Sequence, residues 1–214
     1  MKYKYIMWDW NGTLLNDVDV NFEILNILLK RRDLPPFSGI EKYLDMFSFP
    51  IINFYEKAGF DLINEKYEDI AREYSNLYDD LFPTVELYEK TEEMLRFFFN
   101  AGVSQLIISA SQQRLLTHQV NLHGIDHYFD DILGMRDIYG KSKVNIALYW
   151  MQSKGVSSED VLFIGDTVHD KQVADAIGCD CILVADGHNS KSLLTSTGAT
   201  VVDTLEQIKE LVTQ

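Results

Sequence analysis

The chain has 214 residues, of which 46% are hydrophobic and 24% are charged, and its formal net charge is −14. This length suits one catalytic domain with a small insert and excludes two ordinary large domains, while the apolar fraction predicts a packed core. The acidic balance excludes the basic surface of a typical nucleic-acid binder and disfavours attraction to anionic membranes, so we expect neither partner.

The first predicted element is a short buried strand over residues 3–8, which ends at the polar loop that begins with Asp9. The segment before Asp9 is too short for a signal peptide. No apolar run approaches the ~18 residues that a membrane-spanning helix needs. We therefore expect a cytoplasmic protein.

Residues 17 to about 82 are predicted to be helical, in three stretches separated by the Pro35-Pro36 break and by Gly59. Apolar and aromatic side chains recur there at helical spacing. Within this region the aromatic turn 47–50 either lines a pocket or packs inside the helical part. The Arg31-Arg32 pair either binds a substrate carboxylate or ends a helix in solvent.

From about residue 83 onward, predicted strands alternate with predicted helices. The strands are expected at 105–108, 131–133, 161–164, 181–184 and 200–202, and the helices at 87–98, 111–123, 142–153, 168–177 and 205–212. This alternation predicts the α/β class, with a doubly wound parallel sheet and right-handed crossovers. The helical stretch then forms an insert, which divides the chain into a core of residues 1–15 and 84–214 and a helical cap of residues 16–83.

Polar side chains cluster where the predicted strands end, and ligands bind at this edge of such sheets. The clusters are Asp9 and Asn11, then Ser109, then Lys141 and Lys143, then Asp166 and Asp170. Asp9 and Asp166 follow separate strands, and two carboxylates beside a phosphate suit Mg²⁺. Alternatively, Asp166 and Asp170 only cap the helix that follows them.

Four segments together resemble the haloacid dehalogenase superfamily. Residues 9–14 (Asp-Trp-Asn-Gly-Thr-Leu) are similar to its first motif, Asp-x-Asp-Gly-Thr, and Ser109 is similar to its second. Gly140-Lys141 resembles the third motif, and residues 165–170 (Gly-Asp-Thr-Val-His-Asp) resemble the fourth. The motifs occur in the family's order and span most of the chain, and the helical insert resembles the family's small cap. The pattern is similar to the subfamily around phosphoglycolate phosphatase.

The resemblance implies a role for each of these residues. Asp9 attacks phosphorus to form an aspartyl-phosphate, which is a known use of a carboxylate nucleophile. The implied metal ligands are Asp9, the backbone carbonyl of Asn11 and Asp166, with Asp170 holding a metal-bound water or the lysine. The phosphoryl group would be held by Ser109 and Lys141 and by backbone N–H groups near Trp10 and Ala110.

Two lysines compete for the third motif. Lys141 directly follows the glycine, as in the family pattern, and is preferred here over Lys143. The lysine that is not used is expected to be a solvated surface charge.

Asn11 departs from the family pattern, which has an aspartate there that protonates the leaving group and activates water. An amide cannot do this general acid–base work, which typically contributes ~10²–10⁴-fold. The substrate could have a good leaving group, another group such as Asp17, His169, Tyr43 or Tyr55 could replace the aspartate, or turnover could be slow. His188, which follows the predicted strand 181–184, could also line this edge.

The resemblance implies a Mg²⁺-dependent phosphatase that acts on a small phosphorylated metabolite, as a monomer or a homodimer. One alternative is a phosphoryl-transferring mutase of the β-phosphoglucomutase type, because weak water activation would prolong the aspartyl-phosphate. The other is a weakly catalytic protein that binds a phosphorylated metabolite.

Overall fold

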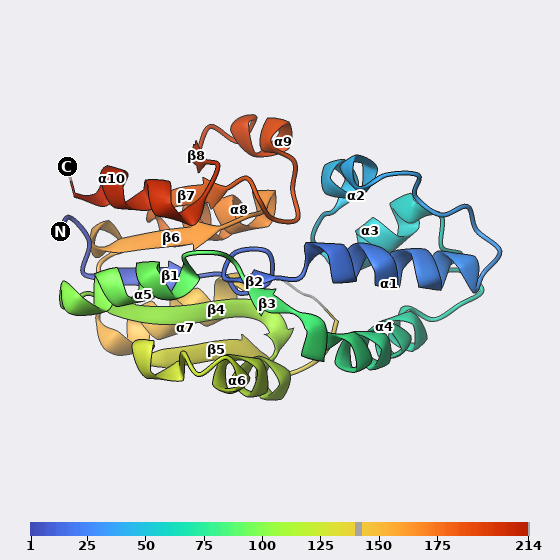
Figure 1. Cartoon of the computed structure of the whole chain (residues 1–214), viewed down its shortest axis with the longest axis horizontal. Helices are drawn as coiled ribbons and strands as arrows, with labels where there is room; N and C mark the ends of the chain where they lie inside the picture. The colour runs from blue at the N-terminus through green and yellow to red at the C-terminus, as the bar shows by residue number, and fades with distance from the viewer. Residues whose placement is uncertain (140–142, 214) are drawn as a thin grey trace.

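The computed structural model describes residues 1–139 and 143–213, and in these residues six strands form one parallel sheet in the order β5-β4-β1-β6-β7-β8. The strands are β1 (Tyr5–Trp8), β4 (Ser104–Gln112), β5 (Asp131–Met135), β6 (Val161–Gly165), β7 (Asp180–Val184) and β8 (Thr200–Val202). The first strand lies in the middle of the sheet and pairs with β4 on one side and β6 on the other. The loops after β1, β4 and β6 therefore emerge side by side (Figure 1).

Helices cover both faces of this sheet, as expected for a parallel sheet whose strands are buried on both sides. The helices of this part are α5 (Thr91–Asn100), α6 (Gln113–Leu122), α7 (Val144–Lys154), α8 (Val168–Ile177), α9 (Lys191–Thr195) and α10 (Ile208–Val212). Side chains alternate along β1: Ile6 and Trp8 join the core on the face of α5, α6 and α10, whereas Met7 packs with α7 and α8. Because successive side chains of a strand point to opposite faces, an apolar strand such as β1 contributes to the hydrophobic core on both faces of the sheet.

A second group of helices extends from the strand-end edge of the sheet, on the side away from both chain termini (Figure 1). It comprises α1 (Val18–Lys30), α2 (Ile40–Met46), α3 (Ile51–Ala58) and α4 (Tyr67–Leu81). The chain leaves and re-enters the sheet part through a two-residue antiparallel ladder of β2 (Leu15–Asn16) and β3 (Glu86–Leu87). We propose this ladder as the boundary between the core, residues 1–15 and 84–214, and the cap, residues 16–83.

The predicted fold class is confirmed, and several predicted elements lie within a few residues of the observed ones. The helix over 168–177 and the strand over 200–202 match α8 and β8 residue for residue. The helix predicted to begin at residue 111 begins only at Gln113, because β4 runs on to Gln112. Two short helices, α2 and α9, and the β2–β3 ladder were not predicted. Short 3₁₀ turns occupy Phe82–Thr84, Asp126–Tyr128, Ser158–Asp160 and Leu205–Gln207.

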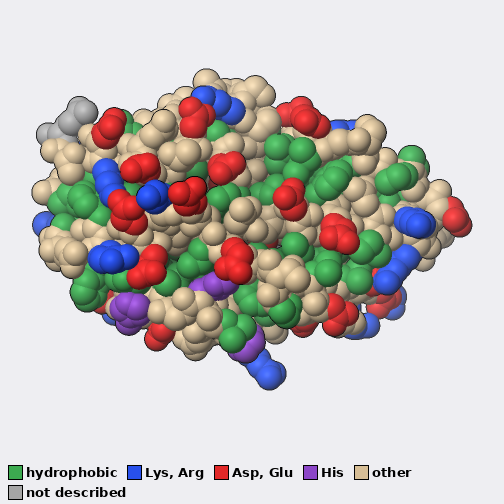
Figure 2. All heavy atoms as spheres, in the orientation of Figure 1, with side chains coloured by type: hydrophobic (Ala, Val, Ile, Leu, Met, Phe, Trp, Pro, Cys, Tyr) green, Lys and Arg blue, Asp and Glu red, His purple; other side chains and the backbone are tan. Residues whose placement is uncertain are grey.

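The molecular surface carries the acidic excess of the sequence. Figure 2 shows acidic side chains spread over the sheet part and the helical cap, with fewer lysines and arginines between them. This face therefore has no continuous basic area of the kind that contacts a nucleic-acid backbone. Among the described residues, the helices are all too short or too polar to cross a membrane.

Candidate active site

The loop after β1 places Asp9 at the centre of the candidate site. The residue is 7% exposed, and its Oδ1 atom accepts a hydrogen bond of 2.7 Å from the backbone N–H of Trp10. The Nζ atom of Lys143 also lies 2.7 Å from Oδ1. Within residues 1–139 and 143–213 the other oxygen, Oδ2, has no hydrogen-bond partner, so one carboxylate oxygen is held and the other is left to react.

The same loop brings Asp9 close to Asp166, which follows β6. Thr13 donates a hydrogen bond of 2.8 Å from Oγ1 to Asp166 Oδ1, and the backbone N–H of His188 donates one of 2.6 Å to Oδ2. Gly12 has a φ of +71°, and a Cβ atom there would lie 2.3 Å from Asp166 Oδ2. A glycine is therefore needed at this position, both for the backbone conformation and for the close approach of the carboxylate.

Asp170 has two functions at the start of α8. Its Oδ2 atom accepts hydrogen bonds from the backbone N–H groups of Asp166 and Thr167 and forms a reciprocal capping box with Thr167. Its Oδ1 atom lies 2.7 Å from Lys143 Nζ. The capping interpretation thus holds for Asp170, but the residue also positions the lysine, and Asp166 is engaged by Thr13 and His188 instead.

Lys143 lies between the two carboxylates and is 1% exposed. The expectation that this lysine is a solvated surface charge is wrong, because two buried carboxylates bind it. Lys141, the predicted motif lysine, lies outside the described residues, and its role stays a prediction. Lys143 directly precedes the first residue of α7, Val144, and this position at the helix start is the signal that could have identified it.

The carboxylates of Asp9, Asp166 and Asp170 form a compact acidic cluster. Oxygen atoms from all three lie within 4.8 Å of one another, and all three side chains are buried. Burial and the negative charges of Asp170 and Asp166 raise the pKa of Asp9 well above its usual value, despite the attraction of Lys143. Burial, followed by the charge of Asp170, raises the pKa of Asp166 to about 6, despite the opposing charge of His188.

This cluster fits a divalent cation. Among the described residues, three buried carboxylates lie together and one lysine, Lys143, pairs with two of them, so negative charge is in excess. An all-oxygen donor set is what Mg²⁺ prefers. Asp170 is already committed to Lys143 and to the cap of α8. Asp9 and Asp166, with the backbone carbonyl of Asn11, are therefore the residues that would hold the ion. The structure thus brings together Asp9 and Asp166, the two acidic ligands predicted from the sequence.

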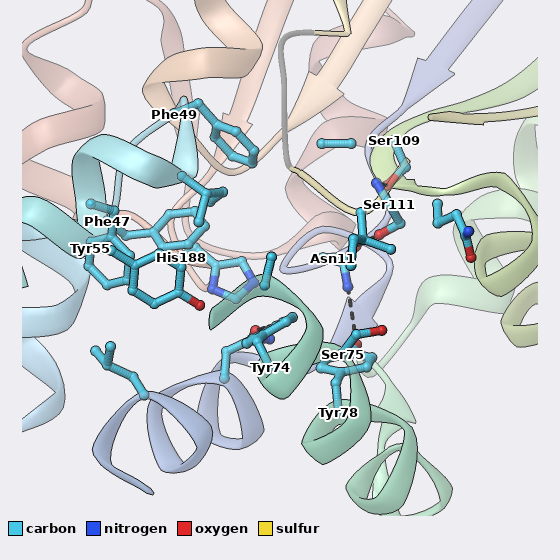
Figure 3. A pocket seen from close by; sticks show the side chains of 18 of the residues that line it. Asn11, Phe47, Phe49, Tyr55, Tyr74, Ser75, Tyr78, Ser109, Ser111 and His188 are labelled. Atoms are coloured by element: carbon cyan, nitrogen blue, oxygen red, sulfur yellow. Dashed lines mark hydrogen bonds between the residues drawn. The ribbon is translucent and has the colours of Figure 1, made fainter. Parts of the chain in front are cut away.

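The side chain of Asn11 is fixed on both sides. Its Nδ2 atom donates hydrogen bonds of 2.7 Å to Asp17 Oδ2 and 3.1 Å to the Tyr78 hydroxyl, and its Oδ1 atom accepts one of 2.6 Å from Ser111 Oγ. Figure 3 shows Asn11 between Ser111 and Tyr78. Of the four residues considered as replacements for the missing acid, Asp17 alone forms a hydrogen bond with Asn11 in the described part of the chain. Its carboxylate also accepts hydrogen bonds from Tyr78 and Asn21.

The other candidate replacements lie elsewhere around the site. The Tyr43 hydroxyl is 2.7 Å from His188 Nδ1, and the His169 ring stacks on Phe49. Tyr55 lines the cavity described below. His188, which was expected either to line this edge or to be an ordinary residue, lines the cavity, is 3% exposed and reaches Asp17 with Nε2 at 3.3 Å.

The predicted phosphate-binding groups are only partly free. The indole of Trp10 is buried and donates from Nε1 to Gln119, so this residue can offer only its backbone N–H, which here binds Asp9. Ser109 Oγ accepts a hydrogen bond of 3.0 Å from the backbone N–H of Ser111. Ser109, Ala110 and Ser111 all line the cavity beside Asp9. This position is compatible with binding of a phosphoryl oxygen by Ser109 and Ala110, a role that stays a prediction.

A cavity of about 160 Å³ joins this cluster to the helical cap. Asp9, Asn11 and Ser109 line its inner end. Figure 3 shows Phe47, Phe49, Tyr55, Tyr74 and Tyr78 across the pocket from Ser109 and Ser111. The aromatic turn 47–50 therefore lines the pocket, as one of its two interpretations proposed. Ser111, Tyr74 and Tyr78 were not predicted as site residues.

Comparison with known proteins gives a consistent result. Residues 6–184 match the family model of haloacid dehalogenase-like hydrolases. A phosphoglycolate phosphatase of Vibrio parahaemolyticus is 25% identical over 98% of this chain and 96% of its own. One from Pseudomonas fluorescens is 24% identical over 96% of this chain and 78% of its own.

Solved structures show the same architecture. A haloacid dehalogenase-like hydrolase of Bacteroides fragilis superposes with a TM-score of 0.85 at 20% identity, covering 97% of this chain and all of the other. A predicted phosphoglycolate phosphatase of Haemophilus somnus gives 0.82 at 21% identity, covering all of this chain and 99% of the other. At these identities the likeness concerns the fold, including the helical cap.

Proposed function

The chain belongs to the haloacid dehalogenase-like hydrolases, and we propose that it hydrolyses a small-molecule phosphate monoester through a phosphorylated Asp9 with the help of Mg²⁺. The observation that carries this proposal is the Asp9 carboxylate, which has one oxygen bound to Lys143 and Trp10, has the other oxygen unbound, and belongs to a cluster with Asp166 and Asp170. This arrangement orients a nucleophile at the inner end of a cavity.

The chain's own residues account for the positioning of the reaction. Lys143 and the Trp10 N–H hold Asp9 Oδ1, which leaves Oδ2 as the oxygen that would attack phosphorus. The bound Mg²⁺ would supply positive charge that removes the repulsion between the anionic nucleophile and the phosphate. Asp166 would hold the ion, Thr13 orients Asp166, and Asp170 keeps Lys143 in place. We propose that Ser109 and the Ala110 N–H bind phosphoryl oxygens.

The test is release of inorganic phosphate from a panel of aryl, acyl and sugar phosphates, with Mg²⁺ or with EDTA. We expect release that requires Mg²⁺, and a phosphorylated protein detected by mass spectrometry after acid quenching. Asp9→Asn should abolish both signals. The matched control is Asp126→Asn, which changes an exposed aspartate outside the cavity lining and should retain both signals.

The two alternatives give different outcomes in the same assay. A mutase would show a persistent phosphorylated Asp9 and would need a bisphosphate for activity. A metabolite-binding protein would bind inorganic phosphate in the presence of Mg²⁺ without a phosphorylated Asp9. Location in the cytoplasm and the choice between monomer and homodimer remain predictions from the sequence.

Magnesium binding also has a readout that does not depend on activity. A ligand that binds only the folded state stabilises it by about 2.7 kcal/mol when present at 100 times its Kd. We therefore expect Mg²⁺ to raise the unfolding temperature of the wild-type protein and of Asp126→Asn, but not that of Asp166→Asn. An equal rise in Asp166→Asn would place the ion elsewhere.

A further inference from the structure

The cap side of the cavity is built from aromatic rings. Five of them come from α2, α3 and the connection between these helices, and the other three lie on one face of α4. These residues are Tyr43, Phe47, Phe49, Phe54, Tyr55, Tyr67, Tyr74 and Tyr78. The α4 members recur at helical spacing, with Ala71 and Ser75 between them on the same face. Such walls favour a planar apolar group, because aromatic rings pack edge to face or offset against one another.

The described part of the pocket wall offers no lysine or arginine to a negatively charged leaving group. Within residues 1–139 and 143–213, no lysine or arginine lines the cavity. The cap arginines are already paired: Arg32 binds both Glu65 and Glu73, and Arg31 binds Glu73 at 2.5 Å. The possibility that this arginine pair binds a substrate carboxylate is thus not supported.

The one imidazole in the wall is also committed. His188 Nε2 lies 3.3 Å from Asp17 Oδ1, and Nδ1 lies 2.7 Å from the Tyr43 hydroxyl. Positive charge on His188 would therefore be matched by a buried carboxylate. A second carboxylate entering the cavity would lose water without gaining a counter-ion, which is costly.

The size of the cavity limits the leaving group further. Its volume of about 160 Å³ is close to the roughly 150 Å³ of an engineered apolar cavity in another protein that holds one benzene ring. A phosphate bound at Asp9 occupies part of this space. The space is therefore of the scale that suits a leaving group with a single six-membered ring.

Asn11 restricts the chemistry of the leaving group. Its amide cannot transfer a proton to a leaving group, although it donates hydrogen bonds. The hydrogen bonds with Asp17 and Ser111 fix its orientation. Phenols ionise near ~10, as the tyrosine side chain does, whereas water ionises near ~15.7 and simple alcohols resemble water. A phenolate can thus leave without a general acid, which an alkoxide cannot do readily.

We propose that the cavity selects phosphate monoesters of small uncharged phenols and discriminates against leaving groups that carry a carboxylate, such as that of phosphoglycolate. This inference rests on the proposed function and specifies its substrate class. Asp9 Oδ2 attacks phosphorus and the P–O bond to the ring breaks. The phenolate departs with the electron pair and takes a proton from solvent. Water then attacks the phosphorylated Asp9, releasing inorganic phosphate and a proton and restoring the carboxylate.

A matched set of four substrates tests the proposal with the full chain and Mg²⁺. Phenyl phosphate and 4-carboxyphenyl phosphate differ by one charge. We expect kcat/KM for the carboxylated compound to be lower on the order of 100-fold, because its charge is buried without a partner. Cyclohexyl phosphate has a ring of similar size but a poorer leaving group. Its kcat/KM should also be lower than that of phenyl phosphate, on the order of 10²-fold, which is the lower end of what a general acid contributes. Phosphoglycolate should be slower than phenyl phosphate.

A second measurement reads the pocket without turnover. Phenylphosphonate and 4-carboxyphenylphosphonate cannot be hydrolysed at the P–C bond, and titration calorimetry should show tighter binding of the uncharged compound. Ser75→Arg adds a cation to the wall at α4 and should narrow or reverse this preference, whereas the neutral control Ser75→Gln should preserve it.

The outcomes separate the two proposals. Equal or better use of phosphoglycolate or 4-carboxyphenyl phosphate would overturn the substrate class while leaving phosphatase activity in place. Selective binding of phenylphosphonate without phosphate release from any substrate would support the pocket's selectivity and overturn the proposed function. Absence of both selective binding and phosphate release would overturn both.

Discussion

Asn11 Nδ2 donates a 2.7 Å hydrogen bond to Oδ2 of the buried Asp17, and this contact makes an amide rather than a carboxylate suitable at position 11. A carboxylate there would face Asp17 directly, and two carboxylates at such a distance cannot both ionise readily. The residue that departs from the family pattern is therefore complementary to its neighbour on the cap side.

Asn11→Asp should create a pair of carboxyl groups that share a proton. We expect the variant to unfold at a lower temperature than the wild type near neutral pH, with a smaller difference below pH ~4, where both groups are protonated. The shared proton would make position 11 a general acid. Turnover of cyclohexyl phosphate should then rise, by up to about 10²-fold, while phenyl phosphate changes little.

The control for this prediction is Asn11→Asp combined with Asp17→Asn. The double variant exchanges the amide and the carboxylate and should recover part of the stability lost in the single variant. An Asn11→Asp variant without a gain on cyclohexyl phosphate, or with equal gains on both substrates, would show that the missing acid does not limit turnover. Thermal unfolding and kcat/KM for the two substrates provide the readouts.

Much of the core could be predicted because the sequence patterns that specify its strands and helices are local. Buried strands such as Val161–Gly165 are continuous apolar runs, and α8 has its own cap at Thr167 and a terminating glycine, Gly178. Asp9 and Asp166 were found because each follows such a strand. The topology of a parallel sheet then brings the two residues to one edge.

The remaining site residues depend on tertiary contacts that have no local pattern. Lys143 is buried because Asp9 and Asp170, far away in sequence, provide its counter-charges. Tyr74 and Tyr78 look like ordinary core residues of an amphipathic helix, and their place in the cavity wall follows from the docking of the cap on the sheet. Short elements such as α2 contain too few residues for a periodic signal.

Lys143→Met should be severely destabilising, because it leaves the buried carboxylates of Asp9 and Asp170 without their cation. Removing one partner of a buried ion pair typically costs about 3–5 kcal/mol. We expect a loss of this order in the free energy of unfolding, measured by urea titration in EDTA, together with loss of phosphate release. The control Lys154→Met removes an exposed lysine that pairs with Asp131 and should cost at most about 1 kcal/mol.

A double variant separates charge from packing at this position. Adding Asp170→Asn to Lys143→Met removes one of the two uncompensated charges and should restore part of the stability. If the single variant is as stable as the wild type, Lys143 does not neutralise the cluster, and Lys141 becomes the better candidate for the motif lysine. Unfolding of Lys141→Met under the same conditions gives the direct comparison.

The buried Asp17–His188 pair should make stability depend on pH in two opposite directions. Burial opposes ionisation of Asp17, but the hydrogen bond and charge of His188 and hydrogen bonds from Asn11 and Tyr78 hold its pKa below its usual value. Burial likewise opposes protonation of His188, but the hydrogen bond and charge of Asp17 raise the pKa of the imidazole overall.

The two pKa shifts determine whether each group stabilises the protein more at low pH or at high pH. A lowered carboxyl pKa contributes stability that is present above its unfolded value, ~3.9, and is lost as the pH falls through the folded value. A raised histidine pKa contributes stability that is present below its unfolded value, ~6.5, and is lost as the pH rises through the folded value. The pair should therefore stabilise the protein most between pH ~4 and ~6.5, and this contribution should decline at higher pH.

The measurement is the unfolding temperature of the wild type and of His188→Gln from pH 4 to pH 9, in EDTA so that no metal contributes. We expect the difference between the two proteins to be largest in the acidic half of this range and to shrink as the pH rises. His127→Gln, which changes an exposed histidine outside the cavity lining, should follow the wild type throughout. A difference between wild type and His188→Gln that stays constant across the range would mean that His188 contributes through packing against Phe47 and not through its charge.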